Sequence, residues 1–118
     1  MKNYNQLTDL DKRLFAGNFA NAIKDKTLNQ LRNNEVEGIH FEPRAPASYN
    51  FVFFNVKFYG IEAVVEVEYD DEDSADICLV EADHSKLIIA EITLPWAFNG
   101  RASDIDDAKI HVVERRND

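Results

Sequence analysis

The acidic side chains of this chain are concentrated in one short stretch. Between Lys57 and Lys86 there are ten acidic residues and no basic residue: Glu62, Glu66, Glu68, Asp70, Asp71, Glu72, Asp73, Asp76, Glu81 and Asp83. The whole chain of 118 residues has 22 acidic residues against 13 Lys and Arg, and its formal net charge is −9. Outside the stretch the charges nearly balance, so the net negative charge belongs to this segment.

Carboxylates at this density attract cations and basic protein surfaces, and they repel nucleic-acid phosphates. One interpretation is a solvated surface that keeps a strand edge from aggregating. The other is a docking surface, because carboxylates on one face of a strand recur about every 6.8 Å. Phosphates of one DNA strand recur about every 3.4 Å along the axis, so two acidic strands can imitate a nucleic-acid backbone.

We therefore expect a small binding protein that docks on a positively charged partner, such as a nuclease, and inhibits it. Two versions remain open: an immunity or antitoxin protein, and a phage anti-defence protein that imitates nucleic acid. The predicted partner-binding acids are Glu62, Glu66, Glu68, Asp70, Asp71, Glu72, Asp73 and Asp76. The predicted apolar anchor consists of Phe51, Phe53 and Trp96, since exposed aromatic residues beside charges are typical of binding hot spots. The alternative for these aromatic residues is a second small cluster covered by the 43–50 loop or the C-terminal segment.

Other chemistry has weaker support in the sequence. A calcium loop is suggested by Asp70, Glu72, Ser74, Asp76 and Glu81, but Ala75 stands where such loops need glycine. The histidines, His40, His84 and His111, lie on three separate segments, which disfavours a zinc site. Cys78 lies in an acidic neighbourhood, which disfavours a reactive thiolate. Glycine-rich phosphate motifs and nucleophile motifs are absent. We predict no metal, no cofactor and no enzymatic activity.

The first third of the chain has helical periodicity. Thr8 is placed to cap a helix over 9–23, with Asp9 and Asp11 in its first turn. One face of this helix is expected to pack through Leu10, Leu14, Phe15, Phe19, Ala22 and Ile23. Thr27 and Gln30 have the spacing of a capping box, which predicts a second short helix that ends near Asn33.

From Val36 onward the hydrophobic period is two. Pro43 and Pro46 are expected to end the first strand. Strands 51–59 and 61–69 form a hairpin around Tyr59–Gly60, with Phe58 opposite Ile61 and Lys57 opposite Glu62. The expected pairs of the next strand, over 75–82, are Tyr69 with Ala75, Val67 with Ile77, Val65 with Leu79 and Glu68 with Asp76. The last pair joins like charges, so either the register slips or a cation or basic group lies there.

The remaining elements complete an antiparallel meander. A strand over 87–94 presents Ile88, Ala90, Ile92 and Leu94 on one face, and a helical turn over 103–107 precedes a strand over 108–114. The expected fold class is α+β. An N-terminal helix, either one or two in tandem, packs on one face of an antiparallel meander sheet of about five to six strands, in a single domain over 1–118.

This layout leaves two other function classes open. One is a ligand-binding or enzymatic cone of the cystatin or NTF2 type, with a pocket between helix and sheet lined by His40, Tyr49 or Glu91. The other is a subunit of a larger, virion-type assembly that pairs through a sheet edge. The single cysteine and the absence of an apolar leader or a membrane-length apolar stretch predict a soluble cytoplasmic protein with no membrane partner.

Overall fold

The computed structural model describes residues 2–48, 50–71, 73–94 and 102–113, which form an α+β fold built on one mostly antiparallel sheet. The strand order is β2-β3-β4-β5-β6-β7, and β1 pairs in parallel with the beginning of β4. Neighbouring strands from β2 onward are consecutive in sequence, so the predicted meander is confirmed. The strands are β1 Lys2–Asn3, β2 Ile39–Ser48, β3 Phe51–Phe58, β4 Ile61–Asp71, β5 Ser74–Val80, β6 Lys86–Thr93 and β7 His111–Val112.

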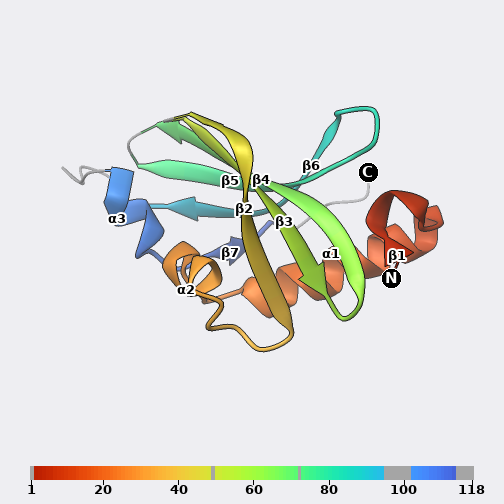
Figure 1. Cartoon of the computed structure of the whole chain (residues 1–118). Helices are drawn as coiled ribbons and strands as arrows, with labels where there is room; N and C mark the ends of the chain where they lie inside the picture. The colour runs from red at the N-terminus through yellow and green to blue at the C-terminus, as the bar shows by residue number, and fades with distance from the viewer. Residues whose placement is uncertain (1, 49, 72, 95–101, 114–118) are drawn as a thin grey trace.

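The helices are the 3-10 helix η1 Tyr4–Gln6, α1 Asp9–Ile23, α2 Leu28–Arg32 and α3 Ala102–Asp106. Helices α1 and α2 begin where the sequence predicts, whereas the helix at Tyr4–Gln6 was not predicted. The Thr8 hydroxyl accepts a hydrogen bond from the Asp11 amide at 3.1 Å, and Thr27 and Gln30 form the predicted capping box. α1 lies along one face of the sheet, below it in Figure 1, and we call the opposite face the outer face. Among the described residues, no helix is both long and apolar enough to span a membrane.

The β3–β4 hairpin has the predicted register. Phe58 lies opposite Ile61, Val52 lies opposite Val67, and Lys57 lies opposite Glu62. The turn residues Tyr59 and Gly60 have φ values of 47° and 79°. Two consecutive positive φ values are those of a type I′ turn, whose twist matches that of the strands it joins.

Aromatic rings fill the space between α1 and the sheet. Phe19 is fully buried, and its ring lies 5.8 Å from Phe15, 6.3 Å from Phe41 and 5.5 Å from Phe58 between centroids. Phe54 continues the cluster at 5.3 Å from Phe41. The interior is therefore a packed core in the described part of the chain.

Two leucines of α1 do not join this core, contrary to the sequence prediction. Leu10 is 64% exposed and Leu14 is 55% exposed. The face that packs on the sheet consists of Phe15, Ala16, Phe19, Ala20 and Ile23. The prediction was wrong because apolar residues occur on two faces of this helix, and periodicity alone does not say which face meets the sheet.

The prolines do not end the first strand, which is a second correction. β2 continues through Pro43 and Pro46 to Ser48, with an irregular register between Arg44 and Ser48. In the described residues β2 pairs only with β3, so it is an edge strand of the sheet. An edge strand tolerates proline because one of its sides makes no ladder hydrogen bonds.

A β-bulge changes the orientation of residues in β6. Ile77 lies opposite Ala90, but Cys78 lies opposite Ile88, so Ile89 is the extra residue. Ile89 is buried, and Ile88 is 40% exposed instead of facing the core as predicted. The strand predicted over 108–114 is reduced to His111–Val112, and the predicted helical turn before it is present as α3.

Candidate functional site

The outer face of the sheet carries a row of like charges on three neighbouring strands. Glu68 of β4 lies opposite Asp76 of β5, and Asp76 lies opposite Glu91 of β6. Because adjacent strands are about 4.8 Å apart, these three positions span about 10 Å. Asp70, which also belongs to β4, forms a hydrogen bond with Asp76. We call Glu68, Asp70, Asp76 and Glu91 the acidic row.

The sequence predicted either a slip in register or a basic group near the Glu68–Asp76 pair, and the structure has a basic group, Lys86. The Nζ atom of Lys86 lies 2.7 Å from Oε1 of Glu66 and 3.1 Å from Oε2 of Glu68. These hydrogen bonds raise the pKa of Lys86. The register therefore holds without a slip, and Lys86 compensates the carboxylates of β4.

Asp76 lies at the centre of the acidic row and is the most perturbed carboxyl there. Partial burial raises its pKa to about 6, together with the hydrogen bond to Asp70 and the negative charges of Asp70, Glu91 and Glu68. In the described residues, no Lys or Arg forms an ion pair with Asp70, Asp76 or Glu91. This part of the row therefore lacks a cation of its own.

Removing the charge of Asp76 is expected to stabilise the protein at neutral pH. Its folded-state pKa lies above the value of about 3.9 in an unfolded chain, so the stability from proton binding is complete below pH 4 and is lost as the pH rises through 6. We expect Asp76→Asn to raise the free energy of unfolding by about 1 kcal/mol at pH 7.5, a value discounted for solvent screening. Urea unfolding at pH 7.5 and pH 4 should show this gain shrinking in acid. A gain of equal size at both values would contradict the assignment.

Other acids of the stretch are compensated by the chain itself. Glu66 is only 5% exposed and pairs with Lys86, so the structure removes it from the predicted docking surface. Glu62 lies opposite Lys57 in the strand register, but no ion pair joins them in the described residues. Glu81 pairs with Lys12 at 3.0 Å and accepts a hydrogen bond from the Tyr4 hydroxyl at 2.7 Å. Asp70, Asp73 and Asp76, which form no ion pair in the described residues, lie toward the β4–β5 turn, at the end of the sheet where α3 also lies (Figure 1).

The other predicted site residues are only partly brought together. Phe51 and Phe53 lie on the outer face as predicted, opposite Glu68 and Glu66, and their rings meet edge-on at 5.5 Å. Both are half-buried, so they offer a smaller apolar surface than expected. Asp73 is exposed, and Asp71 is the last residue of β4. Glu72 and Trp96 lie outside the described residues, as does Tyr49.

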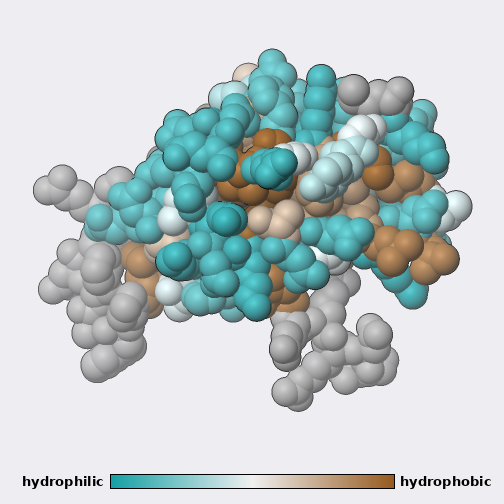
Figure 2. Space-filling view, turned by 90° about the horizontal axis from the view of Figure 1, so that it is seen from below, coloured by the Kyte–Doolittle hydropathy of each residue, from teal (hydrophilic) through white to brown (hydrophobic). Residues whose placement is uncertain are grey.

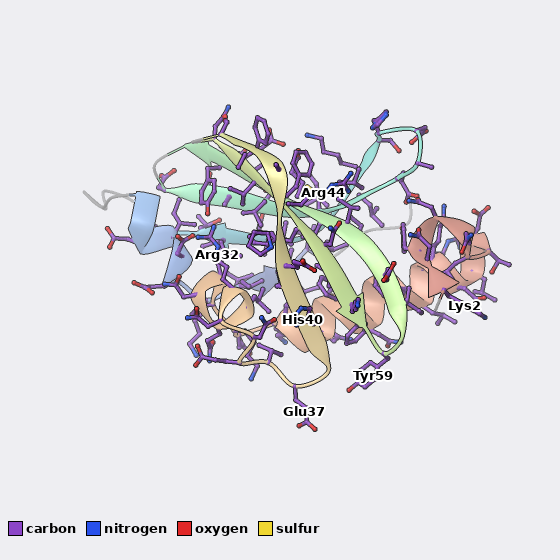
Figure 3. The ribbon with its side chains drawn as sticks, viewed as in Figure 1. Lys2, Arg32, Glu37, His40, Arg44 and Tyr59 are labelled. Carbon is purple, nitrogen blue, oxygen red and sulfur yellow. The ribbon has the colours of Figure 1, made fainter. Side chains whose placement is uncertain are left out.

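Glu91 belongs to the acidic row although it was not predicted to bind a partner. It was considered only as a possible lining of a pocket with His40, but these residues are on different strands, β6 and β2, and both are exposed. Figure 3 shows His40 on the ribbon of β2. Extending the strand register from Asp76 to β6 is the signal that would have identified Glu91.

The structure also places the metal-ligand candidates and Cys78, as far as they lie in the described residues. No three or more of their His, Cys, Asp and Glu side chains are placed to hold a metal ion. The suggested calcium loop is instead a tight hairpin, because β4 ends at Asp71 and β5 begins at Ser74. Cys78 is buried, and burial raises the pKa of its thiol to about 12.

Comparison of the chain with protein-family models, with curated proteins and with solved structures found no match. Any inference about its function therefore rests on the residues and geometry of the chain itself.

Proposed function

We propose that this protein binds a positively charged protein through the acidic row and inhibits it. The observation that carries the proposal is the direct juxtaposition of Glu68, Asp76 and Glu91 on three neighbouring strands. Like charges placed opposite each other destabilise a sheet. A Lys or Arg side chain of a partner relieves this repulsion, so the same arrangement that weakens the free protein favours the complex.

Two further features support a binding protein over the other function classes. The rings of Phe15, Phe19 and Phe58 occupy the space in which a cone-type protein holds its ligand. The β2 edge contains Pro43 and Pro46, which have no amide hydrogen for pairing with a strand of a neighbouring subunit. A nuclease or another nucleic-acid-binding enzyme is the partner class whose basic groove complements a cluster of carboxylates.

Neutralising the row is expected to slow association with the partner. The test variant carries Asp70→Asn, Asp76→Asn and Glu91→Gln, and both it and the native protein serve as bait in an extract of the source organism. For the protein that the native bait retains, we expect the association rate constant at low salt to fall about tenfold or more in the variant. The native rate constant should also decline as salt is added, since salt screens steering.

A matched control distinguishes the effect of the acidic row from the effect of a lower net charge. Asp25→Asn, Glu35→Gln and Glu37→Gln remove the same number of charges from exposed positions outside the outer face of the sheet. This control should associate within about twofold of the native rate. Equal losses in both variants, or an unchanged rate in the row variant, would refute docking through the row. Inhibition is then measured as the partner's nucleic-acid cleavage or binding with the native protein present.

A further inference from the structure

Helix α1 has a second line of residues, beginning with two exposed leucines, that faces away from its own core. Leu10, Leu14, Gly17 and Asn21 follow one another at spacings of four, three and four residues, and all four are exposed. This spacing places them along one side of a helix, as in the seam of a two-stranded coiled coil. A Cβ added at Gly17 would have no neighbour within 4 Å, so a second helix can approach closely there.

Grooves run along both sides of this seam. On one side, α1 and the β3–β4 hairpin line a cleft of about 700 Å³ that includes Leu14, Phe58 and Tyr59. Tyr59 is 77% exposed and projects from the turn beside α1 (Figure 3). On the other side, Gly17 and Ala20 face the exposed Ile88 of β6. Figure 2, which views this side of the molecule from below, shows apolar groups at the surface.

The charges beside the seam are of opposite sign on its two flanks. Counting around the helix at 3.6 residues per turn, Asp11 lies on the flank of the Tyr59 cleft, whereas Arg13 lies on the flank of Ile88. Both side chains are exposed, and neither has an ion-pair partner in the described residues. The seam is therefore locally neutral, unlike the acidic row on the opposite face of the sheet.

We propose that two copies of this chain form a symmetric dimer through α1, with the two helices side by side and parallel. A two-fold axis parallel to the helices brings each seam residue against its own copy, so that Leu14 meets Leu14 and Asn21 meets Asn21. A single polar Asn in a coiled-coil seam specifies the register of the two helices.

The two-fold axis also explains the flanking charges. It brings Asp11 of one copy to the side of Arg13 of the other, about 3 Å apart along the axis. It likewise brings the Tyr59 flank of one copy to the Ile88 flank of the other. In an antiparallel pair, flanks of the same kind would meet, so that Asp11 of one copy would not lie beside Arg13 of the other. Charge complementarity therefore selects a second copy in the parallel orientation.

Sedimentation velocity of the full chain at about 0.15 M salt tests the association, because salt screens the repulsion between two acidic molecules. We expect a monomer–dimer equilibrium within about 1–500 µM, since this is a small interface. Leu14→Glu should yield a monomer throughout this range. His40→Glu introduces the same side chain on the outer face of the sheet and should leave the equilibrium unchanged.

A cysteine variant with its control and a set of charge variants test the orientation. Gly17→Cys should form a disulfide-linked dimer on mild oxidation, whereas Asn5→Cys, which is exposed elsewhere, should not; the native Cys78 is buried and does not interfere. Asp11→Arg and Arg13→Asp should each weaken the dimer about tenfold, because each replaces two ion pairs per dimer with repulsion. The double variant should restore the native affinity.

A native protein that stays monomeric at about 500 µM would overturn the proposal, because even a small specific interface should form dimers at that concentration. So would a dimer that survives Leu14→Glu, a Gly17→Cys dimer that forms no disulfide, or a double charge swap without recovery. None of these measurements involves the acidic row, so they succeed or fail independently of the proposed inhibition.

Discussion

Replacing Phe19 with alanine is expected to lower the free energy of unfolding by about 4 kcal/mol, the largest effect of any single change considered. Phe19 is fully buried, and its ring contacts those of Phe15, Phe41 and Phe58, which come from α1, β2 and β3. Truncation removes the buried ring and leaves a cavity that three separate elements cannot close by a local movement. Urea unfolding followed by circular dichroism measures the loss.

The neighbouring residue supplies the control for this prediction. Asn18 is exposed on the same helix, and Asn18→Ala should change the free energy of unfolding by no more than about 0.5 kcal/mol. A loss below about 1 kcal/mol for Phe19→Ala would mean that α1 does not depend on this ring for its packing on the sheet. The difference in the free energy of unfolding between the two variants therefore measures how much the packing of α1 on the sheet contributes to stability.

Lys86→Ala is expected to destabilise the protein by about 2 kcal/mol at neutral pH. The Glu66 side chain is only 6% exposed, and removing the ammonium group 2.7 Å away leaves a buried carboxylate without its cation. Loss of a fully buried partner costs about 3–5 kcal/mol, but the Lys86 side chain is 41% exposed and water can partly replace it. Thermal and urea unfolding at pH 7.5 measure the effect.

Neutralising the buried carboxylate should reverse much of this loss. The double variant Lys86→Ala with Glu66→Gln should be more stable than Lys86→Ala alone, because no uncompensated charge remains in the site. If Glu66→Gln brings no recovery, the contribution of Lys86 to stability does not come from this ion pair.

These contacts divide the acidic residues into two groups. Lys86 and Lys12 form ion pairs with Glu66, Glu68 and Glu81 of the acidic stretch, and these acids join the chain's own elements. Asp70, Asp76 and Glu91 have no such cation in the described residues, and these are the groups that we propose bind a partner. A dense acidic stretch therefore contains structural carboxylates as well as those proposed to bind.

Local patterns alone were enough to predict most of the elements. The capping residues Thr8 and Thr27 mark the starts of α1 and α2 because their side chains satisfy nearby amides. The β3–β4 register follows from alternation together with the Tyr59–Gly60 turn, since a slip by one residue would turn every apolar side chain to the outer face. The opposition of Glu68 and Asp76 follows from the same alternation in the next strand.

Tertiary structure decided the features that depend on distant partners. Whether Leu14 faces the core depends on which side of α1 meets the sheet, and whether Pro43 ends a strand depends on the strand being at an edge. The burial of Glu66, its pairing with Lys86 and the addition of Glu91 to the row all require strands β4, β5 and β6 to be assembled. Periodicity describes one segment at a time, whereas burial and charge compensation are properties of the surfaces that meet.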